Sequence, residues 1–338
     1  MEGDRETMTV NSTQDTLVEV RNIKKLFPVR RGLFTRSHAG RFVHAVDGVS
    51  VAIRKGEILS LVGESGCGKT TLARLILRLL APTDGTIILD GQDLFGTSGG
   101  EMRKLRLQMQ AVFQDPYASL DPKKTILQVV SEPLVVNHLK NGVQERVRES
   151  LLAVGLSPPE LYLSKFPYEL SGGQRQRVAI ARAIVINPRL IIADEPVSML
   201  DVSIRAEILA LLLDLRQKFN LTYVFITHDL AVARYVSDRM AVMYLGKIVE
   251  IGPAEEICAN PLHPYTKALL SALPSADPRA RHKGVQVKGE VPNAIEIPTG
   301  CRFRPRCPHA FERCIVEPEL VRVGPDHYAA CYLAEEIQ

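Results

Sequence analysis

The chain has 338 residues, and its 42 Lys and Arg against 38 Asp and Glu give a formal charge of +4. Hydrophobic residues make up 46% and charged residues 24%, which is typical of a folded protein and excludes a wholly disordered one. No apolar run reaches about 18 residues, and the polar start is unlike a signal peptide, so we expect a cytosolic protein. Both charge signs are spread along the chain, which does not favour a nucleic-acid-binding face.

The first elements predicted in chain order are strands. Residues 1–15 are polar and are expected to be a flexible N-terminus, and the alternating apolar pattern from Leu17 predicts an edge strand. A basic stretch, Arg30–Arg36, predicts a loop, and Val43–Ile53 predicts a second strand.

Three short apolar runs, each ending in polar residues, predict buried strands of a parallel sheet: Ile58–Val62, Leu190–Ala193 and Tyr223–Ile226. Between them, helical patterns cover Leu72–Leu80, Gln174–Ile186 and Ile204–Phe219. The sequence therefore predicts an α/β fold with its chemistry at the carboxyl ends of the strands.

Two further segments are expected beside this sheet. Gln114–Leu170 is mainly helical but broken by prolines, which predicts an inserted helical subdomain. After Pro253, a short helix over Tyr265–Ala272 is followed by a tail rich in Pro and Cys, which predicts a separate appendage.

A phosphate-binding loop follows the first buried strand. Its residues fit G-x-x-x-x-G-K-[ST]: Gly63, Glu64, Ser65, Gly66, Cys67, Gly68, Lys69 and Thr70. Backbone N–H groups and the following helix would bind phosphate, with Lys69 at the β- and γ-phosphates and Thr70 on Mg²⁺. Thr71 is expected to contact the α-phosphate, whereas Cys67 is expected to be structural.

Polar residues also end the other buried strands. Asp194 is placed to hold Mg²⁺, and Glu195 to activate or orient an attacking water. His228 follows the third run and is a candidate γ-phosphate sensor, although a lone His there is more often structural. Gln114 has an amide that could contact both Mg²⁺ and the water.

A second anion site is predicted at Ser171, Gly172, Gly173 and Gln174, which begin a helix carrying three arginines. One fold cannot easily aim two such sites at one triphosphate. We therefore expect two copies that face each other, each supplying this loop to the nucleotide held by the other.

Together these motifs resemble the ATP-binding cassette (ABC) family, in the family's order, over roughly Leu17 to Gly252. The resemblance implies a P-loop NTPase cassette: a RecA-like core, an antiparallel β edge and a helical subdomain. It also implies an ATP-closed sandwich dimer in which Asp201 relays between sites. Met199 departs from the usual Ala. Phe42 is the candidate for stacking on adenine, with Phe34 as the alternative.

The segment from His263 to Leu270 and the tail are similar to ATPase subunits of oligopeptide/dipeptide importers, of the second ATPase type. This resemblance implies a nucleotide-binding domain at 16–255, with its helical subdomain at about 115–172, and a C-terminal domain at 256–338. Its implied partners are a second, paralogous ATPase subunit, two membrane permeases and, indirectly, a solute-binding protein. The location implied is the cytoplasmic face of the membrane.

Four of the six cysteines lie in the tail: Cys301, Cys307, Cys314 and Cys331. Such a set predicts a metal centre, but the spacing does not choose between iron–sulfur and zinc. His309 and His327 are alternative zinc ligands, and interleaved arginines could offset thiolate charge. The resemblance favours a [4Fe–4S] cluster, with Zn²⁺ or unliganded thiols as alternatives. Cys258 lies apart and is expected to serve packing.

Three other functions stay open on the sequence. The solute could be nickel or a glycan instead of a peptide. The chain could be a soluble ABC ATPase acting on nucleic acid or ribosomes, although it has a single cassette. It could also be a redox module in which ATP binding is incidental, which the full set of nucleotide motifs disfavours.

Overall fold

The computed structural model describes residues 15–29, 41–272, 289–290 and 292–335. Residues 1–14 of the predicted flexible N-terminus, the basic segment Arg30–Arg36 and Phe34 lie outside this part of the chain. The chain divides into two compact units, each described by itself below: residues 1–54, 58–95 and 227–338 form unit 1, and residues 55–57 and 96–226 form unit 2.

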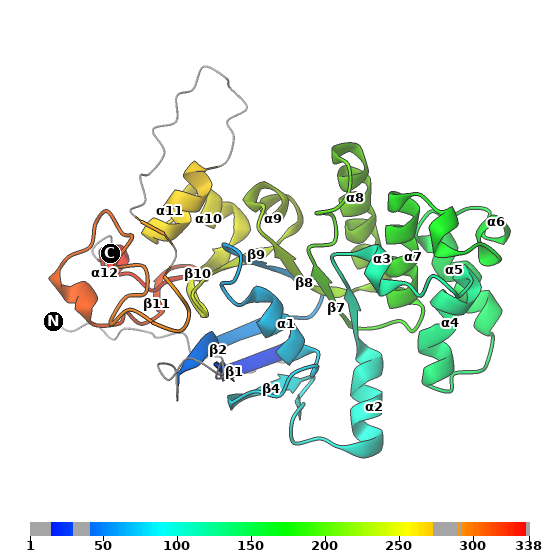
Figure 1. The fold of residues 1–338 in the computed structure, drawn as a ribbon, viewed down its shortest axis with the longest axis horizontal. Helices are drawn as coiled ribbons and strands as arrows, with labels where there is room; N and C mark the ends of the chain where they lie inside the picture. Colours follow the sequence, from blue (N-terminus) through cyan, green and yellow to red (C-terminus); the bar gives the residue numbers. More distant parts are fainter. Residues whose placement is uncertain (1–14, 30–40, 273–288, 291, 336–338) are drawn as a thin grey trace, which may run out of the picture. The chain divides into compact units, whose positions relative to one another are not determined.

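Unit 1 begins with an antiparallel sheet in the order β2-β1-β4-β5, and β1, β2 and β4 lie side by side in Figure 1. A second set of strands runs β11-β12-β10-β9-β3, in which only β3 and β9 are parallel. The elements of unit 1 are β1 (Thr16–Pro28), β2 (Phe42–Arg54), β3 (Ile58–Val62), α1 (Lys69–Ile76), β4 (Asp84–Leu89), β5 (Gln92–Asp93), α9 (Leu230–Val236), β9 (Arg239–Tyr244), β10 (Lys247–Pro253), α10 (Ala254–Ala259), α11 (Pro264–Ser271), the 3₁₀ turn Glu312–Ile315, β11 (Val321–Gly324), β12 (His327–Ala329) and α12 (Tyr332–Glu335).

Unit 2 contains three parallel strands in the order β8-β7-β6. Its helices α3 to α7, drawn in green, gather together in Figure 1, and α4 and α5 pack against α7. The elements of unit 2 are α2 (Gly99–Gln108), β6 (Met109–Val112), α3 (Pro116–Ser119), α4 (Ile126–Val136), α5 (Val143–Ala153), α6 (Glu160–Leu163), the 3₁₀ turn Pro167–Glu169, α7 (Gly172–Ile184), β7 (Leu190–Asp194), α8 (Val202–Phe219) and β8 (Thr222–Thr227).

The three apolar runs form β3, β7 and β8, as predicted. Every residue of β3 and β8 is buried, and so are the first four of β7. Continuous burial is expected for parallel strands covered on both faces. A half-exposed strand would have polar residues at alternate positions, and these runs do not. The uninterrupted apolar runs therefore predict a sheet that is covered on both faces, as observed.

Helix ends follow local capping chemistry. At the start of α7, Ser171 Oγ accepts the N–H of Gln174, and Gln174 Oε1 accepts the N–H of Ser171. This reciprocal pair satisfies two backbone donors that a helix N-terminus leaves unpaired. The helix predicted over Leu72–Leu80 is observed at Lys69–Ile76, so it begins and ends earlier than expected. It ends as α1 at Ile76 and Arg78 has a φ of 52°, a left-handed conformation that a helix cannot continue through.

Candidate functional site

The phosphate loop lies in unit 1, between β3 and α1. Gly63 and Gly68 have φ of 145° and 110°, which L side chains rarely adopt. A Cβ at Gly63 would lie 2.3 Å from the Met243 carbonyl oxygen, and one at Gly68 would lie 2.2 Å from that of Ala45. The backbone of the loop therefore packs too closely on its neighbours to accept a side chain at either position.

Lys69, the first residue of α1, turns back into the loop. Its Nζ donates to the carbonyl oxygens of Gly63 at 2.6 Å and Glu64 at 3.0 Å, and its side chain is buried. A buried ammonium within this loop contributes the positive potential that a phosphate needs. Thr70 and Thr71 follow in the first turn of the same helix.

Cys67 is buried within the loop, and burial raises the pKa of its thiol. Its Sγ lies 3.5 Å from Lys69 Nζ. A thiol that stays protonated is a poor nucleophile, which agrees with the structural role expected for Cys67.

Outside the loop, unit 1 also holds His228, which is exposed and follows β8 directly. The next residue, Asp229, is the N-cap of α9, and its carboxylate accepts the N–H groups of Ala231 at 2.9 Å and Val232 at 3.3 Å. This cap fixes the backbone directly C-terminal to His228.

In unit 2 the structure brings together two of the predicted catalytic residues. Gln114 Nε2 donates to Glu195 Oε2 at 3.0 Å, although the residues are far apart in sequence. Gln114 follows β6, and Glu195 follows β7, whose last residue is Asp194. Neighbouring parallel strands bring their carboxyl ends to one edge of a sheet, and this pairing places an amide against a carboxylate.

The backbone of Glu195 is held in an unusual conformation. Its φ is 48°, a left-handed value that costs a non-glycine residue free energy. Its N–H donates to the Ile226 carbonyl at 3.0 Å, and its own carbonyl accepts the Ser198 hydroxyl at 3.1 Å. These bonds fix the backbone of the turn after β7.

The Ser171–Gln174 segment begins α7, where the Ser171 hydroxyl takes part in the capping pair described above. A Cβ at Gly173 would lie 2.9 Å from Ile204 Cγ2, so glycine is needed there for packing on α8. The arginines of α7 bind within unit 2. Arg175 lies 3.6 Å from the Tyr117 ring centroid, and Arg182 donates to the Ser119 carbonyl at 2.6 Å.

Met199, which stands where the family resemblance predicts Ala, lies in the turn between β7 and α8. Arg205 donates to the carbonyls of Leu200 at 2.7 Å and Ser198 at 3.2 Å, which fixes the turn. Met199 is 61% exposed, and Asp201 is also exposed where α8 begins. Met199 therefore adds a large apolar side chain to the surface of this turn.

Phe42 begins β2, where it pairs with Pro28, and is 43% exposed. It is thus available for stacking on a planar ring, as its role as the adenine candidate requires.

The four tail cysteines line one small cavity, together with His263, Phe303 and His309. A backbone hydrogen bond of 3.0 Å from Cys301 to Cys314 joins two of them. Burial raises the pKa of Cys301 to about 11 and also raises the pKa of Cys307 and Cys331. Within the described residues, no group of three or more His, Cys, Asp or Glu side chains is placed to hold a metal ion. The fit to an iron–sulfur cluster or to zinc is therefore not supported.

The arginines interleaved with these cysteines have other partners than the expected thiolates. Arg302 binds Asp47 and the Leu245 carbonyl, and Arg306 binds Glu64 of the phosphate loop. Spacing in the sequence places these arginines beside the cysteines, whereas packing turns their guanidinium groups toward carboxylates of β2 and the phosphate loop. Cys258 is half-buried against the hydrophobic cluster of unit 1, in agreement with a packing role.

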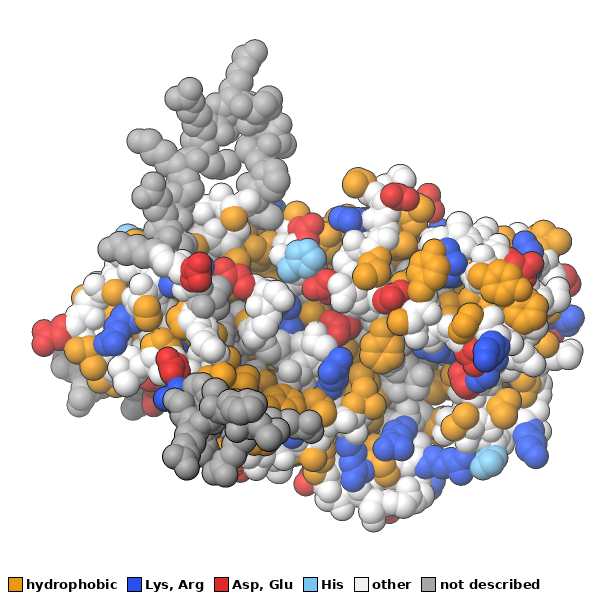
Figure 2. All heavy atoms as spheres, in the orientation of Figure 1, with side chains coloured by type: hydrophobic (Ala, Val, Ile, Leu, Met, Phe, Trp, Pro, Cys, Tyr) orange, Lys and Arg blue, Asp and Glu red, His pale blue; other side chains and the backbone are white. Residues whose placement is uncertain are grey.

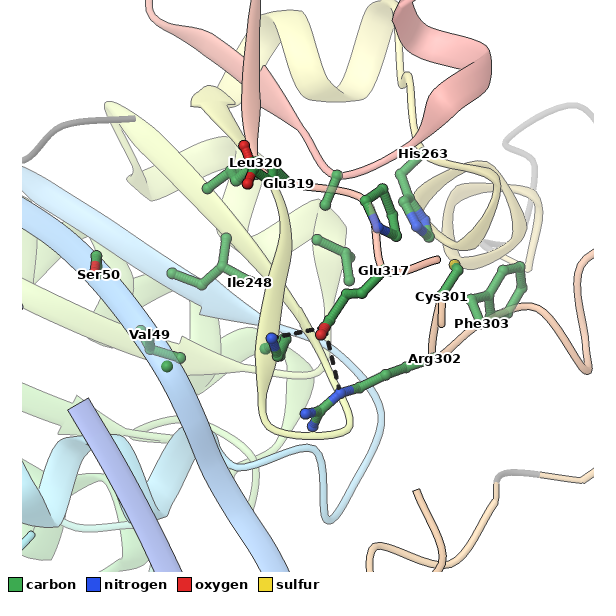
Figure 3. Close-up of a pocket in the computed structure, with 15 residues that line it drawn as sticks. Val49, Ser50, Ile248, His263, Cys301, Arg302, Phe303, Glu317, Glu319 and Leu320 are labelled. Atoms are coloured by element: carbon green, nitrogen blue, oxygen red, sulfur yellow. Dashed lines mark ion pairs between the residues drawn. The ribbon is translucent and has the colours of Figure 1, made fainter. Parts of the chain in front are cut away.

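A larger pocket of about 520 Å³ lies beside the tail, lined by residues of β2, β10 and the tail. Figure 3 shows Glu317 and Arg302 directed toward each other within it. Glu317 Oε1 is also 2.6 Å from Lys247 Nζ. None of the phosphate-loop residues lines this pocket, and its two cationic side chains, Lys247 and Arg302, both pair with Glu317.

Among the described residues, no helix is long and apolar enough to cross a membrane. Two family descriptions match the chain: "ABC transporter" over residues 46–198, and "Oligopeptide/dipeptide transporter, C-terminal region" over residues 249–314. The second match begins in β10 and covers the helix α11 and three of the tail cysteines.

Relatives match almost the whole chain. Oligopeptide transport ATP-binding protein AppF of Bacillus subtilis (strain 168) is 48% identical over 95% of this chain and 98% of its own length. Di/tripeptide transport ATP-binding protein DppF of Pseudomonas aeruginosa (strain UCBPP-PA14) is 44% identical over 95% of this chain and 99% of its own.

Solved structures share the fold. CbiO1 from Clostridium perfringens, part of the ABC transporter complex cbiONQ, has a TM-score of 0.62 and 28% identity, over 73% of this chain and 92% of its own. The ATP-binding cassette MJ0796, a dimer bound to ADP and Pi in a post-hydrolysis state, has a TM-score of 0.60 and 31% identity, over 70% and 99%. The phosphate loop, the paired Gln114 and Glu195, and these likenesses lead to one assignment: this chain belongs to the ABC transporter family, as an ATP-binding protein with the oligopeptide/dipeptide type of C-terminal region.

Proposed function

We propose that the chain is the ATP-binding and ATP-hydrolysing subunit of an importer for oligopeptides or dipeptides. The observation that carries this proposal is the match to peptide-transport ATP-binding proteins over 95% of the chain. It includes the C-terminal region, which a cassette match alone would leave out. Nickel or glycans are the alternative solutes.

Binding of ATP is assigned to the phosphate loop. Lys69 exchanges the carbonyls of Gly63 and Glu64 for the β- and γ-phosphate oxygens, and the loop N–H groups bind the phosphates as well. Phe42 stacks on the adenine. The hydroxyl of Thr70, the amide oxygen of Gln114 and the carboxylate of Asp194 are oxygen donors of the kind that Mg²⁺ prefers. When bound, Mg²⁺ neutralises charge on the phosphates.

Hydrolysis is assigned to the residues after β7 and β8. Glu195 takes the proton of the attacking water or orients this water, and the hydrogen bond from Gln114 holds the Glu195 carboxylate in place. His228 contacts the γ-phosphate and stabilises the charge that develops there. In a sandwich dimer the partner copy supplies its Ser171 loop, and Asp201 relays between the two sites.

Coupling to transport needs a surface for membrane permeases, and we assign it to the helical segment of unit 2. Large hydrophobic side chains are exposed there, among them Tyr117, Val136, Leu161 and Tyr168. Figure 2 shows hydrophobic side chains between charged ones on the face that it draws. Exposed apolar groups of this kind are typical of protein interaction sites. The chain then works at the cytoplasmic face of the membrane, beside a second ATPase subunit.

The experiment is a comparison of Glu195→Gln with the wild-type chain in its complex with the permeases. We expect the variant to bind Mg·ATP with unchanged affinity while its turnover falls by at least about a hundredfold, because general-base catalysis contributes that much. Unchanged hydrolysis contradicts the assignment of Glu195. Uptake of peptide into vesicles, compared with uptake of nickel and of glycan, identifies the transported solute. Copurification of RNA or DNA instead of permeases contradicts the transport role.

The metal hypothesis for the tail is tested separately, by iron, sulfide and zinc analysis of anaerobically purified protein. The four cysteines line one cavity, and this neighbourhood is what supports the hypothesis. Iron and sulfide in stoichiometric amounts support a [4Fe–4S] cluster, and zinc alone supports the alternative. Protein free of all three contradicts both metals and leaves the cysteines as free, partly buried thiols.

A further inference from the structure

Glu64, the second residue of the phosphate loop, is held by two residues of the C-terminal region. Arg306 donates to both of its carboxylate oxygens, with Nη1 to Oε2 at 2.9 Å and Nη2 to Oε1 at 3.2 Å. The backbone N–H of Glu64 donates to the Tyr265 hydroxyl at 2.8 Å. Both partners lie within residues 249–314, outside the matched cassette region. One loop residue is thus fixed through both its side chain and its backbone.

Arg306 and Tyr265 are themselves rigidly placed. The rings of Tyr244, Tyr265 and Phe303 pack together with centroids 4.6 to 5.5 Å apart, and all three are buried. The Arg306 guanidinium lies 5.9 Å from the centroids of Tyr244 and Phe303. Side chains packed in this way have little rotameric freedom to lose when they bind, so they can position a neighbour with little entropic cost.

The charges explain why this contact matters for a nucleotide. A carboxylate in a phosphate loop repels a triphosphate unless a cation neutralises it. Arg306 is that cation, because its guanidinium forms a bidentate ion pair with the Glu64 carboxylate. Glu64 also shares a link with the phosphate-binding lysine, since its carbonyl accepts Lys69 Nζ at 3.0 Å. Displacing Glu64 therefore affects both the charge of the loop and the position of Lys69.

We propose that Arg306 and Tyr265 are positioning residues for the phosphate loop, through which the C-terminal region sets the affinity for ATP. Arg306 neutralises and anchors the Glu64 side chain, and Tyr265 anchors its backbone. The proposal rests on the proposed function of the loop in binding ATP.

The test is equilibrium binding of Mg·ATP to the full chain. For Arg306→Gln we expect an increase in Kd of about tenfold, because a bare carboxylate then faces the phosphates. Arg306→Lys keeps the positive charge but loses the bidentate geometry, so it should recover part of the affinity. Arg304→Gln is the matched control, since Arg304 lies on the same turn and its guanidinium donates to the Thr299 hydroxyl at 3.4 Å, away from Glu64. Its Kd should stay within about twofold of the wild-type value.

A second variant separates positioning from a general loss of structure. Glu64→Gln removes the repelling charge, so the Glu64→Gln/Arg306→Gln double variant should bind ATP within about twofold of Glu64→Gln alone. In hydrolysis assays Arg306→Gln should raise KM by the same factor as Kd and leave kcat nearly unchanged. Tyr265→Phe keeps the ring and should raise Kd by a few fold.

Three results overturn the proposal. One is an affinity of Arg306→Gln equal to that of Arg304→Gln. Another is a weakened Arg306→Gln that the Glu64→Gln change does not rescue, which would mean that Arg306 only supports the folding of the tail. Lys69→Ala provides the third comparison. If this variant binds ATP like the wild-type chain, the loop is not the ATP site, and both the proposed function and the positioning role are overturned. Loss of binding in Lys69→Ala with unchanged Arg306 variants overturns the positioning role alone.

Discussion

We predict that His263 makes the stability of unit 1 depend on pH. Its ring is fully buried, and burial lowers its pKa to about 4, while Glu250 raises it and Lys267 lowers it further. Glu250 also accepts the N–H groups of Leu262 and His263 and pairs with His327 at 2.8 Å. The Nδ1 atom of His263 accepts the Tyr265 N–H at 3.0 Å and so caps α11. Protonation of Nδ1 removes this acceptor and places a charge in the core.

The magnitude follows from the two pKa values of His263. In the unfolded chain the pKa of histidine is about 6.5. Because the folded pKa is lower, the stabilising contribution is complete above about pH 6.5 and is lost progressively as the pH falls toward 4. Between about pH 7.5 and pH 5.0 this amounts to a loss of about 2 kcal/mol.

The assay is chemical denaturation of the full chain at a series of pH values, followed by circular dichroism because the chain contains no tryptophan. His263→Asn keeps a side-chain oxygen that can cap α11 but does not titrate. We expect the variant to lose about 2 kcal/mol less than the wild-type chain between about pH 7.5 and pH 5.0. His138→Asn, at an exposed position with a φ of 57° that Asn tolerates, is the control and should follow the wild-type curve. An unchanged pH slope in His263→Asn would refute the reasoning.

Two further substitutions test the loop and the aromatic cluster. Gly68→Ala should abolish binding of Mg·ATP, because its Cβ would lie 2.2 Å from the Ala45 carbonyl oxygen at a φ of 110°. Gly100→Ala is the control and should bind normally, because its Cβ would have nothing within 4 Å. Equal binding by both variants contradicts the close packing of the loop. Phe303→Ala should lower the free energy of unfolding by about 3–5 kcal/mol in denaturant titrations, since the Phe303 side chain is 1% exposed. Phe311→Ala is the control and should lower this free energy much less, since Phe311 is 38% exposed. Comparable losses in the two phenylalanine variants would show that the cluster around Phe303 is not tightly packed.

The strands and their motifs could be predicted because the signals are local. A run such as Ile58–Val62 carries its burial pattern in its own residues, and the glycines after it determine the turn that follows. The short helix expected over Tyr265–Ala272 is observed at Pro264–Ser271, with proline in its first turn. Family resemblance then supplied roles for residues such as Glu195, whose chemistry no periodicity reveals.

The partners of the side chains were decided only by tertiary packing. Gln114 and Glu195 are 81 residues apart in the chain and share a hydrogen bond, and Glu64 and Arg306 are 242 apart and form an ion pair. The set of four tail cysteines predicts a metal centre, yet the neighbouring Arg306 binds Glu64 of the phosphate loop instead of thiolates. Sequence patterns specify which face of an element is buried, because side-chain periodicity is fixed by the backbone. Contacts between distant side chains depend on how those faces pack, which no local pattern encodes.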